Sequence, residues 1–266
     1  MMTGAEEQHM DSQDTGAPQF ASGRSGRTGS ELTPTTPAAD PAGNAESKSL
    51  TIMAPCKPSR ELLFAHLPAS AHAERMRQLR TELMLRHAPG RAECLSLAVI
   101  SPAAGEGRSV LAAELALAFS QLGKRTLLID ADMRRPRQHQ LFEVGQRDGL
   151  QQLISRFDPK MILRVDGFPA LHVVTAGEPG EQNPSELLSD GRFDAIIRKF
   201  RELFDYIIVD SPEFSEYTDA RVISTVIGSV LTVSRSGKTS MRASRDMLTQ
   251  LKPSGARILG GVINGG

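Results

Sequence analysis

Short apolar runs alternate with helical patterns from about residue 71 to the end of the chain. The apolar runs are mostly continuous rather than alternating with polar residues, which is typical of parallel strands covered on both faces. We therefore expect an α/β fold with a mostly parallel sheet and helices on both faces. The expected strands are 94–100, 125–130, 171–174, 205–210, 229–234 and 258–263, and the expected helices are 71–86, 109–122, 149–155, 192–203, 218–226 and 239–251.

The first 57 residues have a different composition. They are rich in Gly, Ser, Thr, Pro, Ala and acidic residues, and Phe20 is their only aromatic residue. Such a segment cannot bury enough apolar surface to offset the conformational entropy lost on folding. We predict a disordered leader over residues 1–57 and one folded domain over residues 58–266.

The charge balance, the lack of long apolar stretches and the low cysteine content indicate where in the cell the protein works. The chain has 31 acidic and 31 basic residues, so its net charge does not favour nucleic acid as a partner. No apolar stretch approaches the roughly 20 residues that span a bilayer, and the N-terminus lacks the pattern of a signal peptide. Two cysteines, Cys56 and Cys94, cannot form a disulfide framework and are read as inert thiols. We expect a cytoplasmic protein without a membrane span of its own.

A glycine-rich segment carries the first chemical signal. Residues 101–109 read Ser-Pro-Ala-Ala-Gly-Glu-Gly-Arg-Ser and lie between an apolar strand pattern and an apolar helix pattern. Gly105 and Gly107 allow backbone N–H groups to turn toward a phosphate, and a helix N-terminus presents the positive end of its dipole. Ser109 can bind magnesium, cap the helix, or do both. Arg108 stands where such loops usually have lysine.

Three aspartates follow two other apolar strands. Asp130 and Asp132 come at the end of one strand, and Asp210 ends another. Parallel strands bring their carboxyl ends to one edge of a sheet, where ligands bind in open α/β folds. Carboxylates that lie close together repel one another unless a metal or another cation lies between them. A solvated turn would explain either motif alone, but the ordered set of three segments favours a site for a nucleotide and magnesium.

These segments resemble the phosphate loop and the second and third aspartate motifs of bacterial tyrosine kinases, the family that governs capsule and exopolysaccharide synthesis. The resemblance implies a P-loop NTPase fold related to positioning ATPases, over residues 58–266, with ATP and Mg²⁺ as cofactors. It implies that Ser109 binds magnesium directly and that Asp132 and Asp210 support the metal. Asp130 becomes the candidate base, and Arg108 is expected to stabilise charge on the moving phosphoryl group together with the metal. The residues implied to bind the nucleotide phosphates are Gly105, Glu106, Gly107, Arg108, Ser109 and Val110.

Further segments extend the resemblance from about residue 73 to the C-terminus. Glu74, Arg77 and Arg80 are similar to the family's subunit-contact helix, which implies a homo-oligomer, although a solvated helix face explains their spacing equally well. Residues 183–188, Asn-Pro-Ser-Glu-Leu-Leu, match a recurring family segment. Asn264 in the last expected strand corresponds to an asparagine that lies near the adenine in related ATPases.

The chain also departs from the family pattern. Arg108 replaces the lysine, and a planar guanidinium is not equivalent to a compact ammonium in a tight loop. Glu213 stands where the family usually has proline, and Ile227–Gly228 replaces an aspartate-glycine pair. The two tyrosines, Tyr206 and Tyr217, flank the third motif, and no tyrosine-rich tail follows the last strand. We expect retained or weakened phosphate contact and impaired transfer chemistry.

The leading hypothesis is a cytoplasmic ATP-binding protein that works with a membrane polysaccharide co-polymerase and can be recruited by it to the inner membrane. If it is an active kinase, Asp130 takes the proton from a tyrosine hydroxyl. One alternative is a catalytically weakened pseudokinase or scaffold, which Arg108 favours. Another is an ATPase of the kind that positions septa or plasmids, which Ala103 disfavours because it occupies the place of their additional lysine.

Overall fold

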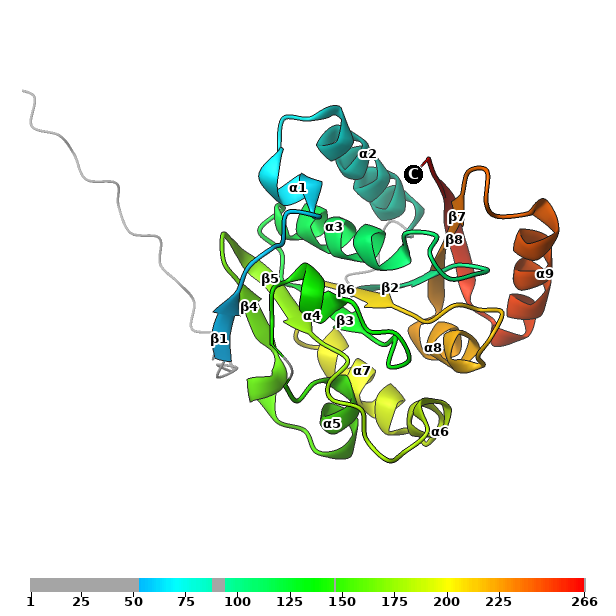
Figure 1. Cartoon of the computed structure of the whole chain (residues 1–266). Coiled ribbons are helices and arrows are strands. Elements are labelled where there is room, and N and C mark those ends of the chain that lie inside the picture. The colour runs from blue at the N-terminus through cyan, green and yellow to red at the C-terminus, as the bar shows by residue number, and fades with distance from the viewer. Residues whose placement is uncertain (1–52, 88–93, 146, 266) are drawn as a thin grey trace, which may run out of the picture. The chain divides into compact units, whose positions relative to one another are not determined.

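The computed structural model describes residues 53–87, 94–145 and 147–265. Within these residues, eight strands form one sheet in the order β1-β4-β5-β3-β6-β2-β7-β8 (Figure 1). Neighbouring strands are parallel except for β4 and β5, which are antiparallel. The strands are β1 (Met53–Cys56), β2 (Leu95–Ile100), β3 (Thr126–Asp130), β4 (Leu163–Val165), β5 (Phe168–Val174), β6 (Tyr206–Asp210), β7 (Ser229–Arg235) and β8 (Arg257–Asn264).

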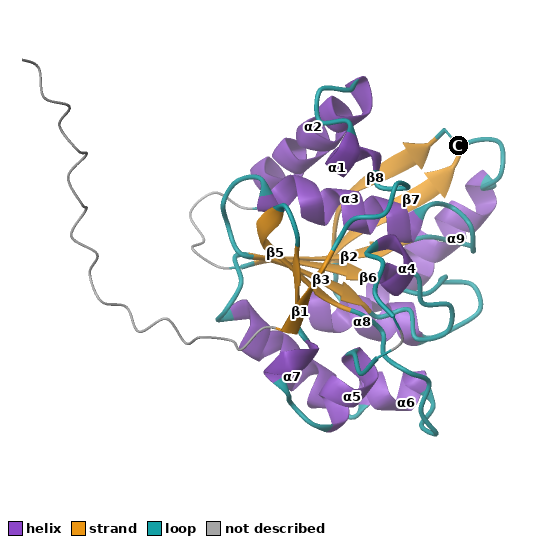
Figure 2. Cartoon of the chain, turned by 60° about the vertical axis from the view of Figure 1, so that its left-hand side comes forward, coloured by secondary structure: helices purple, strands orange, loops and turns teal. Residues whose placement is uncertain are grey.

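Helices cover both faces of the sheet, as Figures 1 and 2 show. Helices α1 to α3 pack on one face, and α5 to α9 pack on the other. The helices are α1 (Leu63–His66), α2 (Ala71–Arg86), α3 (Arg108–Ser120), α4 (Gln138–Leu141), α5 (Leu150–Ser155), α6 (Pro184–Ser189), α7 (Arg192–Arg201), α8 (Asp219–Ile227) and α9 (Met241–Leu251). Two 3₁₀ turns, η1 (Pro159–Met161) and η2 (Lys252–Ser254), complete the described elements.

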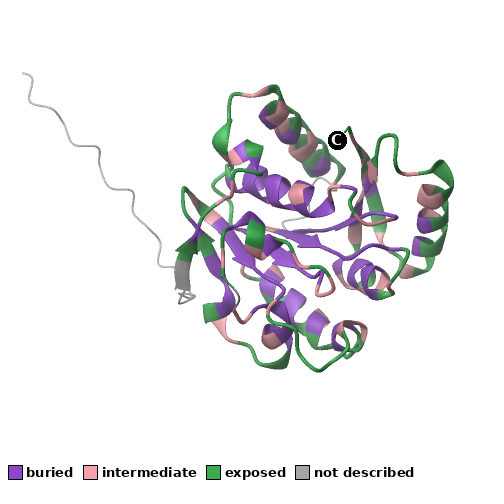
Figure 3. Ribbon diagram, in the orientation of Figure 1, coloured by how far each residue is buried: buried purple, intermediate pink, exposed green. Residues whose placement is uncertain are grey.

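The continuous apolar strands arise because each strand lies between two hydrophobic cores. In β2, Leu97 and Val99 pack against α1 to α3, whereas Ala98 and Ile100 pack against the opposite layer. Successive strand side chains point to opposite faces, so both faces need apolar residues when both are covered. The central strands are accordingly buried throughout (Figure 3). The predicted α/β fold, with a mostly parallel sheet covered on both faces, is confirmed.

Two strands at one side of the sheet differ from the sequence prediction. Strand β1 lies inside the segment expected to be leader, so the described domain begins before residue 58, while residues 1–52 lie outside the described residues. β1 has four residues and includes Pro55, which an edge strand tolerates because one side of its backbone needs no partner. β4 has three residues and pairs with β5 through a tight antiparallel turn. Segments this short carry no periodicity by which a strand can be recognised.

A buried glutamate joins the N-terminal helices to α3. Glu114 is 2% exposed; its Oε1 accepts a hydrogen bond from the Phe64 backbone N–H at 3.2 Å, and its Oε2 lies 2.5 Å from His72 Nε2. Met76 and Leu83 of the expected apolar face of α2 are buried nearby. One carboxylate thus fixes α1 and α2 on the helix that follows the glycine-rich loop.

Replacing this carboxylate should loosen the two helices. We expect Glu114→Ala to lower the free energy of unfolding by about 2–3 kcal/mol, because a buried N–H and an imidazole lose their acceptor. Denaturant unfolding measures the change. Glu202→Ala, at an exposed position at the end of α7, is the control and should stay within about 0.5 kcal/mol of wild type. Equal effects of the two variants would contradict the role given to Glu114.

Candidate functional site

The three motif segments meet at one edge of the sheet. β6 lies between β3 and β2, and its parallel register with β3 sets Asp130 directly beside Asp210. The turn after β2 therefore lies at the same edge as the segments after β3 and β6. Ser109 also hydrogen-bonds to Asp210, although burial raises the pKa of Asp210 by more than this bond lowers it. The expected convergence of loop and aspartates is present in the structure.

Two glycines give the loop its shape. Gly105 has φ +73° and Gly107 has φ +91°, values that a residue with a Cβ rarely adopts. A Cβ on Gly107 would also overlap the side-chain amide of Asn264, whose Nδ2 donates to the Glu106 carbonyl at 3.2 Å. Gly107 is the N-cap of α3, so the loop leads directly into the helix N-terminus.

Side chains from the end of β7 and from the connection to α9 bind the outer side of the loop. Lys238 Nζ donates to the Ala104 carbonyl at 2.8 Å, and Arg235 Nη1 donates to the Gly105 carbonyl at 3.3 Å. These cationic partners hold the loop from that side, and the backbone N–H groups of such a loop can bind an anion on the other side. Nothing in the sequence pattern signalled Arg235 or Lys238, because the contacts span 130 and 134 residues.

A cavity of about 270 Å³ lies against this loop. Five residues from the segments that follow β3 and β6 close it from the opposite side. Its lining residues are Ala104, Gly105, Glu106, Gly107, Arg108, Ser109, Val110, Asp132, Arg135, Pro136, Arg137 and Glu213. This cavity is suited to a phosphate group, because the N-terminus of α3, the glycine loop and the arginines all favour an anion there.

Arg108 does not extend freely into that cavity. Its guanidinium is 7% exposed and lies among carboxylates: Nη2 is 3.3 Å from Asp132 Oδ2 and 3.6 Å from Glu213 Oε2. Its Nε lies 4.0 Å from Asp210 Oδ1, and its Nη1 donates to Ser101 Oγ at 2.5 Å. Among the residues that the structure describes, Arg108 is the one arginine or lysine classed as buried.

Asp130 organises the segment that follows β3. Its Oδ1 accepts from the Asp132 backbone N–H at 3.1 Å, and its Oδ2 accepts from the backbone N–H groups of Arg137 at 3.1 Å and Gln138 at 2.9 Å. Burial, and then the neighbouring Asp210, raise the pKa of Asp130 well above its usual range. These contacts give Asp130 a structural role in shaping the loop, and its role as a catalytic base stays a prediction.

The other two aspartates offer oxygens suited to a hard cation. Burial raises the pKa of Asp210 to about 6 and also raises that of Asp132, despite the nearby Arg108. Asp210 Oδ1 is buried and has no hydrogen-bond partner among the described residues, while Gln138 Nε2 donates to Asp210 Oδ2 at 2.9 Å.

These aspartates do not form a metal site by themselves. Within the described part of the chain, no group of three or more His, Cys, Asp or Glu side chains is arranged to hold a metal alone. Magnesium usually takes one or two protein oxygens and completes its shell with water and phosphate. The Ser109 hydroxyl, Asp132 and the unsatisfied oxygen of Asp210 therefore fit the metal that a nucleotide brings with it.

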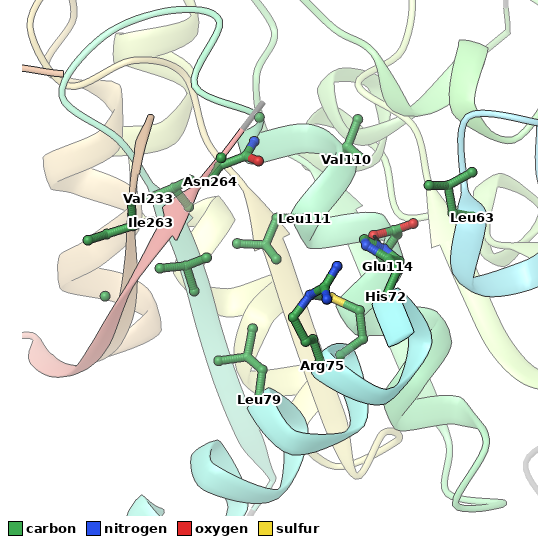
Figure 4. A pocket seen from close by; sticks show the side chains of 15 residues that line it. Leu63, His72, Arg75, Leu79, Val110, Leu111, Glu114, Val233, Ile263 and Asn264 are labelled. Carbon is green, nitrogen blue, oxygen red and sulfur yellow. Dashed lines mark hydrogen bonds and ion pairs between the residues drawn. The ribbon is translucent and has the colours of Figure 1, made fainter. Parts of the chain in front are cut away.

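A second cavity of about 620 Å³ adjoins the loop and shares Gly107 and Val110 with the first. Figure 4 shows Asn264 at one side of it and the His72–Glu114 pair at the other. Its volume falls in the range of small-molecule pockets, and its lining is mainly apolar. The two cavities provide a polar space over the loop and an apolar space beside it.

Comparisons with known proteins also indicate a nucleotide-binding domain. Residues 97–264 match the family of CobQ/CobB/MinD/ParA nucleotide binding domains. The tyrosine-protein kinase YwqD of Bacillus subtilis is 33% identical over 208 residues, which are 77% of this chain and 86% of YwqD. The chain belongs to the bacterial tyrosine kinase family.

Other members of the family are longer or known in three dimensions. The tyrosine-protein kinase Ptk of Acinetobacter johnsonii is 31% identical over 72% of this chain, which spans only 26% of Ptk. The kinase domain of the Escherichia coli tyrosine kinase ETK superposes with a TM-score of 0.71 at 29% identity, covering 77% of this chain and 79% of that domain.

An arginine of the second aspartate motif links the segment after β3 to two helices. Arg134 Nε donates to Asp219 Oδ2 at 3.1 Å, and its Nη2 donates to Asn183 Oδ1 at 2.9 Å and to Ser185 Oγ at 3.1 Å. Its guanidinium also lies 4.5 Å from the centre of the Tyr217 ring. The start of the Asn-Pro-Ser-Glu-Leu-Leu segment therefore anchors Arg134, a contact that the sequence alone did not indicate.

The residues predicted to form a subunit contact lie on α2. Arg80 Nη1 donates to the Ala118 carbonyl at 2.7 Å, and Arg77 Nη2 donates to the Pro68 carbonyl at 2.6 Å. Glu74 is exposed and pairs with Arg77 at 3.2 Å. Both arginines thus have partners within the chain, and the predicted homo-oligomer stays a prediction. None of the described helices combines the length and hydrophobicity needed to cross a bilayer.

Removing the buried guanidinium of Arg108 should lower the stability of the nucleotide-free domain. We expect Arg108→Met to lower the free energy of unfolding by about 3–5 kcal/mol, because Asp132, Asp210 and Glu213 lose their buried counter-charge. Chemical denaturation of the purified protein measures this change.

Arg198→Met serves as the control, because Arg198 is 65% exposed and pairs only with Asp194 of the same helix. Its loss should cost about 0.5 kcal/mol or less. If Arg108→Met were as stable as this control, the acidic cluster would not depend on Arg108.

Proposed function

We propose that this chain binds ATP with magnesium and serves as the kinase domain of a capsule or exopolysaccharide biosynthesis system, with phosphotransfer weakened by Arg108. The observation that carries the proposal is the glycine loop: its outer carbonyls are bound by Lys238 and Arg235, and its other side faces Asp132. A triphosphate placed there would meet backbone N–H groups, a helix N-terminus and a metal-binding edge.

Each motif has a role in this proposal. The backbone of residues 104–110 would bind the terminal phosphates, and the apolar cavity beside Asn264 would accept the base. Ser109, Asp132 and Asp210 would hold magnesium directly or through water. When bound, magnesium supplies positive charge that neutralises the phosphate oxygens. Asp130 would accept the proton of an incoming hydroxyl, as the family resemblance implies.

Arg108 is the reason to expect weak transfer. A guanidinium engaged with three carboxylates is not available to follow the charge on a moving phosphoryl group. A lysine has a single compact ammonium that can lie between two phosphates. The same feature supports the alternative of a scaffold that binds nucleotide without transferring phosphate.

The proposed partner is a membrane polysaccharide co-polymerase. The chain spans about a quarter of the length of Ptk but 86% of YwqD, which supports a kinase unit that works either within a longer protein or beside a separate one. We infer a cytoplasmic location with recruitment to the inner membrane through that partner. Self-association through Glu74, Arg77 and Arg80 belongs to the same proposal.

Septum- and plasmid-positioning ATPases are the distant alternative. They share the nucleotide-binding family that matches residues 97–264. The relatives at 33% and 31% identity are tyrosine-protein kinases, which favours the kinase assignment.

Nucleotide binding can be tested with a matched pair of glycine variants. Gly107 and Gly123 both have positive φ, at +91° and +70°, so an alanine strains the backbone at either place. Only at Gly107 would the new Cβ meet the site, whereas nothing lies within 4 Å of a Cβ at Gly123. We expect Gly107→Ala to weaken ATP–Mg²⁺ binding at least about tenfold and Gly123→Ala to leave it within about twofold, measured by isothermal titration calorimetry. The absence of ATP binding by the wild-type chain would refute the proposal.

Phosphotransfer distinguishes the weakened kinase from the scaffold. We expect Arg108→Lys to raise ATP hydrolysis or labelling of a protein substrate by about tenfold or more, because the ammonium can act on the phosphates. Incubation with radiolabelled ATP, with and without the cytoplasmic part of a co-polymerase, measures both reactions. Unchanged activity in a variant that still binds ATP would favour the scaffold.

A further inference from the structure

Two buried, oppositely charged side chains of the site lie next to each other. Arg108 Nη2 is 3.6 Å from Glu213 Oε2. Glu213 is 1% exposed, and its other oxygen lies 2.9 Å from Arg135 Nη1. A buried carboxylate is costly unless a cation is close to it, and Glu213 lies between two cations, Arg108 and Arg135.

The shape of the guanidinium matters for this contact. One arm of Arg108, Nη1, donates to Ser101 Oγ, while the other arm, Nη2, faces Asp132 and Glu213 together. An ammonium is a single point on a flexible stem and cannot fill both places at once. Glu213 therefore adds a partner that an arginine can use at the same time as Ser101.

The guanidinium also lies where charge neutralisation is needed. Asp132, Asp210 and Glu213 all have an oxygen within 4.0 Å of Arg108. The other nearby arginine, Arg135, has a side chain that is 55% exposed and also pairs with Glu216 at 3.4 Å. Most of the compensation inside the acidic cluster thus comes from one protein cation.

We propose that Glu213 is a positioning residue that keeps Arg108 in the acidic cluster as a resident cation, so that nucleotide binding depends only weakly on magnesium. The inference rests on the proposed nucleotide site and concerns how that site is neutralised. With Arg108 among the aspartates, a triphosphate can approach the loop without first bringing a metal to Asp132 and Asp210. Without Glu213, Arg108 turns toward the phosphates, and the aspartates then require the divalent ion.

The test compares ATP affinity in magnesium and in EDTA by calorimetry. For the wild-type chain we expect the two dissociation constants to differ by about threefold or less, and for Arg108→Lys by about tenfold or more. Glu213→Gln in the wild-type background should raise the dependence on magnesium to about the level of Arg108→Lys. In the Arg108→Lys background the same substitution should change little, because the two side chains act as a pair.

Glu216→Gln is the matched control. Glu216 pairs with Arg135 but has no contact with Arg108, and its side chain is 50% exposed. It should leave the magnesium dependence at the wild-type value. If Glu213→Gln does not fold, as judged by circular dichroism, Glu213→Asp takes its place, because it keeps the charge and shortens the reach.

The outcomes separate the two proposals. Binding of ATP that is equally dependent on magnesium in wild type and Arg108→Lys overturns the resident-cation inference and leaves the nucleotide site standing. Equal effects of Glu213→Gln and Glu216→Gln overturn the positioning role of Glu213. A lack of ATP binding by both the wild type and Arg108→Lys, in either buffer, refutes the nucleotide site itself.

Discussion

The site depends on the neutralisation of acidic side chains that the parallel sheet brings to one edge. β3 and β6 end side by side and deliver Asp130 and Asp210, and Asp132 follows two residues later. Burial raises the pKa values of all three aspartates, and repulsion from neighbouring carboxylates raises them further. Arg108, from the first turn of α3, lies among them. The fold therefore brings the negative charges together and supplies a cation from the neighbouring loop.

The glycine loop is shaped from outside as much as from its own sequence. Lys238 and Arg235 bind its carbonyls, and Asn264 of β8 binds the carbonyl of Glu106. These donors come from β7, β8 and the connection to α9, so the strands on one side of β2 help to fix the geometry of the loop that follows it. A loop prepared in this way loses less entropy when a phosphate binds.

Local patterns were enough to predict the central architecture. The continuous apolar runs indicated strands that are buried on both faces. The order of the motifs along the chain indicated which strand ends lie together. The peripheral strands β1 and β4 could not be predicted, because their three or four residues owe their conformation to pairing with the sheet. The orientation of the Arg108 side chain could not be predicted either, because it depends on Glu213, which lies 105 positions later in the chain. Arg134 shows the same limit: its partners Asn183 and Asp219 are 49 and 85 residues away.

A crystal structure of this chain with a non-hydrolysable ATP analogue tests the central claim most directly. The account predicts density for the terminal phosphates against the backbone N–H groups of residues 104–110, with the base in the cavity beside Asn264. Density for the analogue elsewhere, or a glycine loop without phosphate at saturating analogue, would contradict it.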